Sequence, residues 1–200
     1  MRKKMVMGWL LLLLGGIVTL FWHNEWVYAL PTPVPAHYKP VHTGDAVRLP
    51  QLPVFVQDKP VLLHFFNPDC PCSRFNIPYF TSLVHKYNSQ AAFAIVLMTP
   101  KHYTEKEIQD KFHINIPVIT DASLAATCGV YSTPQAVIID AEQHLYYRGN
   151  YNKSRYCQNT ETNYAEIALN ALLLHTPSTV LYDSNALRAY GCQLPNCTKK

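Results

Sequence analysis

Short apolar runs alternate along the chain with segments in which apolar residues recur at the spacing of one helix face. Residues 61–66 (VLLHFF) and 92–98 (AFAIVLM) are expected to form buried strands, and each run ends at a turn signal. Between them, apolar residues recur at the spacing of an inward-facing helix surface. A capping box beginning at Thr104 predicts a second helix. Further strands are expected at 117–119, 136–139 and 145–148, and a last helix at 162–174. This order predicts an α/β fold, a central mixed β-sheet flanked by helices.

The N-terminus has the pattern of a membrane anchor. Arg2, Lys3 and Lys4 precede an uncharged apolar run over residues 5–22, which is near the short limit for crossing a bilayer. The basic flank predicts a single pass through the inner (cytoplasmic) membrane, with the rest of the chain on the periplasmic, extracytoplasmic side. A cleaved signal peptide is the alternative, because residues 27–29 have the residue sizes that a signal peptidase reads.

The composition divides the whole chain into four segments. Residues 1–29 form the anchor segment, and the Pro-rich residues 30–59 are expected to be a semi-rigid tether that holds the domain away from the bilayer, with a possible edge strand at 54–56. Residues 60–175 are expected to form the folded domain, and residues 176–200 a cysteine-containing C-terminal tail. At 48% hydrophobic residues, the 200-residue chain is sufficient for one buried core.

The net charge and the spacing of the histidines bear on which partners and cofactors the protein binds. The net charge is only +4, and the basic residues outside the N-terminus are scattered among acidic ones, so no nucleic-acid partner is expected. The histidines fall on separate predicted elements, and no metal-ligand spacing emerges. Neither a metal nor another cofactor is therefore expected.

Two cysteines mark the candidate chemistry. Cys70 and Cys72 lie where the first buried strand gives way to a helix N-terminus. Unpaired backbone N–H groups and the helix dipole favour a thiolate at such a place, and the thiolate is the reactive form of cysteine. Because the chain has six cysteines and an export signal, disulfide chemistry is expected. This interpretation requires the two cysteines to be accessible.

The order of these signals resembles the thioredoxin superfamily, most closely its membrane-tethered TlpA/ResA-type thiol-disulfide oxidoreductases. Pro78 follows Cys70 by eight residues, as the helix-kinking proline of that family follows its first cysteine. The segment 129–140 (GVYSTPQAVIID) is similar to the family's cis-proline segment, with Pro134 at the implied position. The resemblance covers residues 60–175 and implies that Thr133 and Pro134 lie against the active cysteine, offering backbone hydrogen bonds to a bound peptide.

The motif departs from the family at the second cysteine. The resemblance implies that Cys70 is the nucleophile, but Ser73 stands where the resolving cysteine is usual, and the motif is CPCS. Cys72 and Cys157 are the candidates to resolve a mixed disulfide. Cys157 lies in the loop 149–159, which in a thioredoxin-like sheet reaches the active-site edge. A loop thiol without this role, or one bridged to the tail, is the alternative for Cys157.

Two further side chains near the motif are candidates. His64 precedes Cys70 by six residues, where thioredoxins carry a buried acid that relays protons, and a neutral imidazole could do the same. The alternative is a core histidine with a satisfied hydrogen bond. Arg74 could hold a thiolate by its charge, or it could be a solvated arginine.

The remaining cysteines are expected to be structural. Cys192 and Cys197 are close together in an exported tail, and such pairs most often form a structural disulfide. Cys128 lies among small apolar residues and is expected to be a buried small hydrophobe.

The function predicted from these features is a membrane-anchored, envelope-facing thiol-disulfide oxidoreductase that acts on protein thiols or disulfides with an unidentified redox partner. Two alternatives stay open. Two thiolates beside an imidazole suit Cu(I), as in a thioredoxin-like copper-binding assembly factor. A redox-silent module could instead use the groove beside Pro134 to bind peptides.

Overall fold

Five strands form the central sheet, in the order β3-β2-β1-β5-β6. The computed structural model describes residues 2–49 and 58–194. The strands are β1 (Val61–Phe66), β2 (Ala92–Leu97), β3 (Val118–Ile119), β5 (Gln135–Ile139) and β6 (Leu145–Gly149). β1, β2 and β3 are parallel, whereas β5 runs antiparallel to both β1 and β6. The expected central mixed sheet is confirmed.

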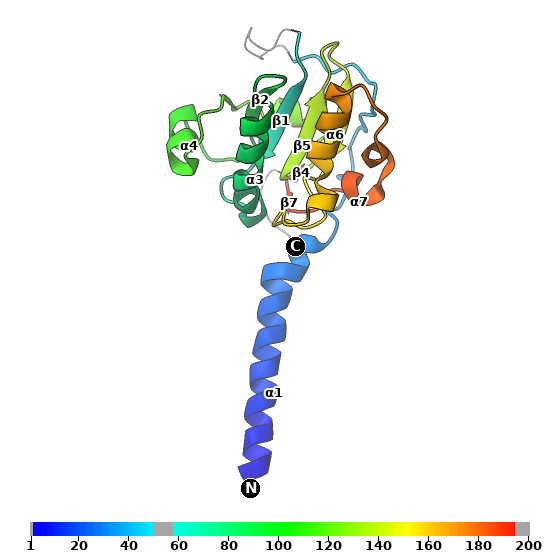
Figure 1. Ribbon diagram of the computed structural model, residues 1–200. Coiled ribbons are helices and arrows are strands. Elements are labelled where there is room, and N and C mark those ends of the chain that lie inside the picture. Colours follow the sequence, from blue (N-terminus) through cyan, green and yellow to red (C-terminus); the bar gives the residue numbers. More distant parts are fainter. Residues whose placement is uncertain (1, 50–57, 195–200) are drawn as a thin grey trace.

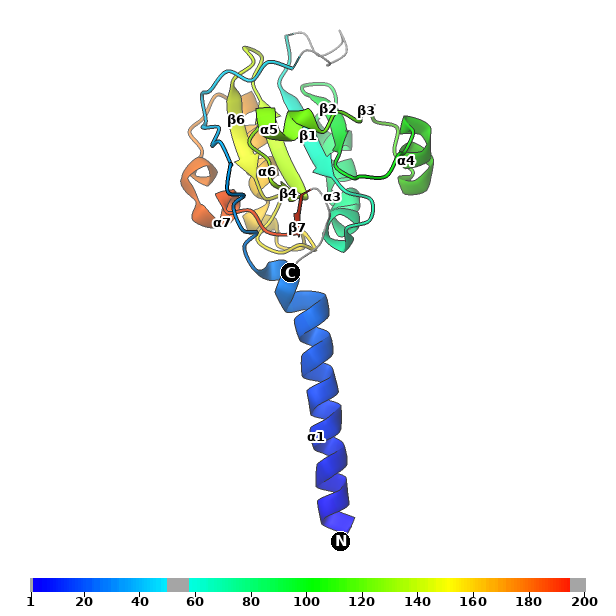
Figure 2. The same ribbon diagram turned by 180° about the vertical axis from the view of Figure 1, so that it is seen from behind.

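Helices cover both faces of this sheet. α3 (Pro71–Tyr87) and α6 (Tyr164–Leu173) lie side by side on one face (Figure 1). The short α5 (Ser123–Thr127) lies on the opposite face (Figure 2). α4 (Glu105–Phe112) lies beyond β3 and begins at the expected capping box of Thr104. A 3₁₀ turn, η3 (Thr160–Thr162), precedes α6.

The central strand β1 divides the core in two. All six of its residues are buried, as expected for a strand covered on both faces. Because side chains alternate along a strand, Leu62 and Phe66 join the core beneath α3 and α6, whereas Leu63 and Phe65 join the core beneath α5. The carboxyl end of β1 therefore delivers the chain to the start of α3 from a fixed position.

The N-terminal helix projects away from the domain (Figure 1). It consists of α1 (Arg2–Phe21), a π-helical turn η1 (Trp22–Trp26) and α2 (Val27–Ala29). The most apolar 18-residue window within Arg2–Trp26 has a mean hydropathy of 2.1, and this helix is long and apolar enough to cross a membrane. None of its most apolar window is buried against the domain, which agrees with the expected apolar N-terminal helix.

The Pro-rich segment does not act as a spacer over its described part. Thr32 is buried and its hydroxyl lies 2.9 Å from the Ser132 hydroxyl, while the Tyr38 hydroxyl donates a hydrogen bond to the Gly129 carbonyl. Val47 is buried in the core beneath α5. Residues 30–49 therefore pack along the domain, because their few apolar and hydroxyl side chains find partners on it. The strand expected at 54–56 lies outside the described residues.

The C-terminal residues return to the domain. They form η4 (Thr179–Tyr182), α7 (Ser184–Leu187) and β7 (Cys192–Gln193). Val180, Ala186 and Ala189 are buried. β7 pairs antiparallel with the short strand β4 (Ser132–Thr133), at the end of the domain from which α1 projects (Figures 1 and 2). The described part of the expected tail is thus built into the fold.

Candidate active site

The turn between β1 and α3 presents the first cysteine. Cys70 is the N-cap residue of α3, and Pro71 occupies the first helical turn, where its missing N–H costs no hydrogen bond. Asn67 closes the turn: its carbonyl accepts from the Cys70 N–H at 3.1 Å and its side-chain oxygen accepts from the Asp69 N–H at 2.9 Å. Ser73 is buried, and its hydroxyl accepts a hydrogen bond from the Asn67 N–H at 3.2 Å. At the position where the family has a resolving cysteine, Ser73 therefore supports the turn.

Cys70 forms a disulfide with Cys192, whose Cα atom lies 6.4 Å away. The two residues are separated by 122 positions in the sequence. Cys72 lies outside this bond but in the same buried sulfur cluster as Cys70 and Cys192. The three sulfur-bearing side chains thus meet at one end of the domain.

The expected Cys192–Cys197 disulfide is wrong in this structure, because Cys192 is bonded to Cys70. Cys197 itself lies outside the described residues. The expectation rested on closeness in sequence, whereas the pairing of β7 with β4 decides which sulfur Cys192 reaches. Nor is Cys70 bonded to Cys72 in this state.

The cis-proline segment lies against the disulfide. The Thr133–Pro134 peptide bond is cis, as the resemblance implied. Thr133 lies directly opposite Cys192 in the β4–β7 pair. The position that the family offers to a bound peptide is therefore occupied by the chain's own C-terminal strand.

This strand also closes the site. Cys70 and Cys72 are both 0% exposed, so the accessibility required of them is not met in the disulfide-bonded form. Because β7 pairs with β4 and its Cys192, also 0% exposed, is bonded to Cys70, reagents and partners reach the disulfide once β7 moves.

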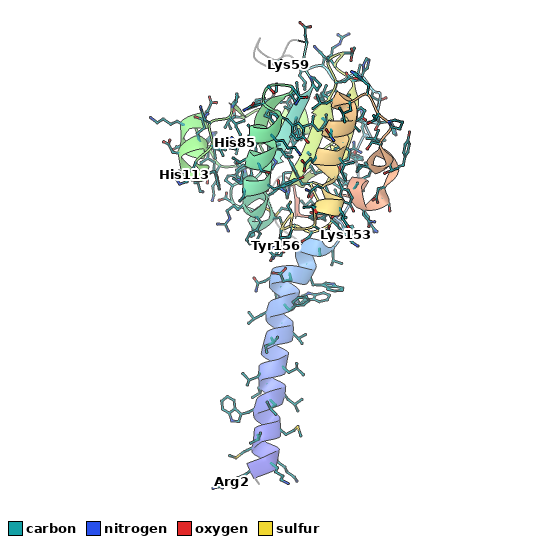
Figure 3. All side chains as sticks on the ribbon, viewed as in Figure 1. Arg2, Lys59, His85, His113, Lys153 and Tyr156 are labelled. Carbon is teal, nitrogen blue, oxygen red and sulfur yellow. A yellow bond between two sulfur atoms is a disulfide. The ribbon has the colours of Figure 1, made fainter. Side chains whose placement is uncertain are left out.

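Arg155 is the cation closest to the sulfur cluster among the described contacts. Its Nη1 lies 4.0 Å from Cys72 Sγ, and its guanidinium stacks over the Phe75 ring at 5.3 Å. Its Nη2 donates to Glu25 Oε1 at 2.7 Å, and the Tyr156 hydroxyl donates to the same oxygen at 2.6 Å. Glu25 belongs to the N-terminal helix, so this contact joins that helix to the edge of the site. Tyr156 is labelled at this junction in Figure 3.

Arg155 was missed by sequence reasoning, which favoured Arg74 as the cation. Arg74 is exposed, and only its backbone N–H has a described bond, to the Cys70 carbonyl. A signal for Arg155 existed: it lies two residues from Cys157, in the loop already assigned to the active-site edge. Its contact with Glu25 was not foreseeable, because nothing in the sequence relates the two positions.

Cys157 lies against α3 one helical turn beyond Cys72. The Asn76 side-chain amide donates a hydrogen bond to Cys157 Sγ at 3.0 Å. Burial raises the pKa of Cys157 to about 12, although this hydrogen bond lowers it. The loop therefore reaches the active-site helix as expected, but its thiol is mostly protonated at neutral pH. Its role as the resolving cysteine stays a prediction.

Cys128 has the environment expected of a small hydrophobe. It is fully buried in the core beneath α5. Burial raises its pKa to about 12, despite an opposing effect of Arg148. Its thiol is therefore protonated and inert at neutral pH.

His64 is a buried neutral imidazole on β1. Its Nδ1 lies 2.8 Å from the Tyr151 hydroxyl, and its ring stacks on Phe80 at 4.5 Å. Burial lowers its pKa to about 3. Nε2 has no hydrogen-bond partner among the described residues. His64 is thus held by packing and by Tyr151, and its role as a proton relay stays a prediction.

Within residues 2–49 and 58–194, no group of three His, Cys, Asp or Glu side chains is arranged to hold a metal ion. The copper alternative gains no ligand set from these residues and stays untested.

The fold is shared with solved structures of low sequence identity. A hypothetical protein from Sinorhizobium meliloti 1021 has a TM-score of 0.64 at 16% identity, over 80% of this chain and 97% of that one. Peroxidoxin BcpB from Mycobacterium tuberculosis has a TM-score of 0.53 at 21% identity, over 70% of this chain and 100% of that one. A putative thiol:disulfide interchange protein DsbE from Chlorobium tepidum has a TM-score of 0.51 at 15% identity, over 67% of this chain and 99% of that one. These likenesses establish the thioredoxin-like fold.

Sequence comparison gives one family. No curated protein matches the chain. The family model described as "Domain of unknown function (DUF6436)" matches residues 41–193, which include the whole described sheet, the Cys70 turn and Cys192. The chain therefore belongs to the DUF6436 family.

Proposed function

We propose that this protein is a thiol-disulfide oxidoreductase whose redox-active pair is Cys70 and Cys192. One observation carries the proposal: the cysteine at the N-terminus of α3 is bonded to a cysteine that lies opposite Thr133, next to the cis peptide bond. The thioredoxin-like fold supports it, because the resemblance assigns the nucleophile to Cys70.

The chemistry follows from exchange between sulfur atoms. In the reduced protein, the Cys70 thiolate attacks one sulfur of a substrate disulfide, and the other substrate sulfur leaves as a thiolate. The Cys192 thiolate then attacks Cys70 Sγ, which releases the second substrate thiolate and forms the Cys70–Cys192 disulfide. Two electrons pass to the substrate, and an external dithiol returns them. The same steps in reverse oxidise a substrate dithiol.

Arg155 supports a role for Cys72 in this exchange. A guanidinium near a sulfur atom favours the thiolate, so Cys72 is a second internal nucleophile that can attack a mixed disulfide at Cys70. Asp69 opposes negative charge at the same turn, and Lys101 offsets it with an ion pair of 3.2 Å. Cys157 is the weaker candidate for this step, because its described partner is the neutral Asn76 amide and burial raises its pKa to about 12.

We place the reaction at the outer surface of the inner membrane. The apolar stretch Arg2–Trp26 and its basic start support a single-pass anchor with the domain outside the cytoplasm. The contact between Glu25 and Arg155 supports a site that faces the bilayer surface. The expected partners are protein thiols or disulfides near the membrane.

The test is reduction of insulin disulfides by dithiothreitol, catalysed by the full-length protein in detergent. We expect Cys70→Ser to abolish catalysis. Cys192→Ser should slow turnover and accumulate a mixed disulfide at Cys70, because the principal internal thiol that resolves it is missing and Cys72 is left as the second nucleophile. Cys128→Ser is the matched control and should keep the wild-type rate. Catalysis that survives Cys70→Ser would overturn the proposal and leave the buried disulfide as a structural link.

A further inference from the structure

Residues 191–194 lie along β4, next to the cis-proline and Cys70, in the way that an added strand pairs with the edge of a sheet. Cys192 and Gln193 pair with Thr133 and Ser132, and the Leu194 N–H donates to the Tyr131 carbonyl at 3.3 Å. Backbone pairing of this kind is how extended peptides bind to exposed strands. Here the peptide is the chain itself, and its cysteine is already bonded to Cys70.

We propose that residues 191–194 are a built-in substrate mimic, and that the substrate is an extended segment with the pattern glycine, cysteine, any residue, apolar residue, which replaces them on β4. This inference rests on the proposed function and adds the substrate class to it.

The chain offers a hinge for this replacement. Residues just before the mimic are firmly held: the Asn150 side-chain amide donates to the Arg188 carbonyl at 2.8 Å, the Tyr190 hydroxyl donates to the Asn152 carbonyl at 2.8 Å, and Ala189 is fully buried. Gly191 follows with a φ of 108°, in the region that favours glycine. Once the disulfide is broken, the segment is held by non-covalent contacts alone, among them a two-residue strand pairing, flanking hydrogen bonds and the burial of Cys192. Residues 191–194 can therefore leave while the domain stays folded.

The backbone of β4 restricts which residue can stand immediately before the cysteine. A Cβ atom on Gly191 would lie 2.2 Å from the Thr133 carbonyl oxygen and 3.4 Å from Pro134 Cδ. The first atom belongs to the backbone of β4 and cannot turn aside. A substrate in the same register therefore needs glycine immediately before its cysteine.

The residue two positions after the cysteine contacts an apolar pocket. Leu194 lines a pocket of about 430 Å³ together with Met98, Val130, Tyr131 and Tyr38. Met98 and Val130 are buried members of the core beneath α5, so the wall of this pocket is fixed. An apolar side chain in the place of Leu194 gains contact here, whereas a charged one loses its hydration.

The experiment uses the Cys192→Ser variant of the full-length protein, reduced, in detergent. The probe is a peptide copying residues 189–194, with its cysteine bonded to thionitrobenzoate. The Cys70 thiolate attacks the peptide sulfur, the sulfur–sulfur bond breaks, and thionitrobenzoate leaves as a coloured thiolate. The Cys70→Ser, Cys192→Ser double variant supplies the background from the other thiols.

We expect the peptide to react about tenfold faster than its Gly191→Ala or Leu194→Asp versions, since a tenfold effect needs only a small differential interaction. Equal rates for the three peptides, with rapid reaction of Cys70 toward Ellman's reagent, would overturn the mimic and leave the proposed function standing. A Cys70 that is unreactive toward both Ellman's reagent and every peptide would overturn the proposed function, and the mimic with it.

Discussion

Cys192 lies directly opposite Thr133 in the β4–β7 pair, and its sulfur is bonded to Cys70. Strand pairing and redox state are therefore coupled at one residue. Breaking the bond leaves β7 held on β4 by non-covalent contacts alone, so that Cys70 and the strand edge beside Pro134 can open together, and forming the bond covers both.

Replacing Gly191 with alanine should loosen the closed form. The new Cβ would lie 2.2 Å from the Thr133 carbonyl oxygen, at a φ that L-residues rarely adopt. Strain of this size weakens the Cys70–Cys192 disulfide, so we expect dithiothreitol to reduce it about tenfold faster. The reduction potential should become less negative by about 30 mV. Alkylation of Cys70 and Cys192 followed by mass spectrometry measures the rate after timed reduction, and the potential after equilibration in redox buffers.

Gly44→Ala is the matched control for this substitution. Gly44 also has a positive φ, of 91°, but its added Cβ would meet nothing within 4 Å. It should leave the reduction rate of the disulfide unchanged. If the two variants behave alike, the contact with Thr133 does not govern the stability of the closed form.

Arg155 should activate Cys72. We expect Arg155→Gln to slow the alkylation of Cys72 by iodoacetamide in the reduced protein at neutral pH about threefold to tenfold, because it removes a cation 4.0 Å from the sulfur. Peptide mass mapping of the alkylated protein measures the rate at Cys72 alone. Arg74→Gln is the control, because Arg74 is exposed on the same helix. A larger effect from Arg74 than from Arg155 would contradict the assignment.

The disulfide should also stabilise the domain. It closes a loop across 122 sequence positions, which restricts the unfolded chain. We expect Cys192→Ser to lower the free energy of unfolding by about 3 kcal/mol, measured by urea unfolding in detergent without reductant. Cys197→Ser should have no effect, since Cys192 is bonded elsewhere. A comparable loss from Cys197→Ser would instead support the Cys192–Cys197 pairing.

His64 should make stability depend on pH. Its pKa is lowered by burial to about 3, against 6.5 in the unfolded chain. Between these values the unfolded state binds a proton that the folded state does not, so stability falls as pH falls. The slope from this group is about 1.4 kcal/mol per pH unit.

Urea unfolding at pH values between about 6 and 4 tests this contribution. His64→Leu should reduce the slope by about 1.4 kcal/mol per pH unit, whatever its effect on stability at neutral pH. Tyr151→Phe, which removes the hydrogen bond to Nδ1 but keeps the imidazole, should retain it. An unchanged slope in His64→Leu would show that His64 titrates normally.

The fold was predictable because its signals are local. A continuous apolar run is typical of a central strand, and β1 is buried at every residue. The capping box of Thr104, the α3 N-terminus at Cys70 and the proline at 134 each carry their signal within a few residues. Sequence patterns report such short-range preferences well.

The completion of the site was not predictable, because it depends on contacts between distant segments. Cys192 reaches Cys70 through β7, a strand of two residues too short to have a pattern of its own. Arg155 is oriented by Glu25, which lies 130 positions earlier in the chain. The Pro-rich segment also packs through single side chains such as Thr32. None of these pairings has a local signature.

The most direct test is equilibration of the full-length protein with glutathione and dithiothreitol buffers of known potential, followed by acid quenching, alkylation and mass spectrometry of the Cys70–Cys192 pair. A redox-active pair should be half reduced between about −270 and −120 mV, the range of thioredoxin-like oxidoreductases. A disulfide that stays intact below about −300 mV would be a structural link and would contradict the account.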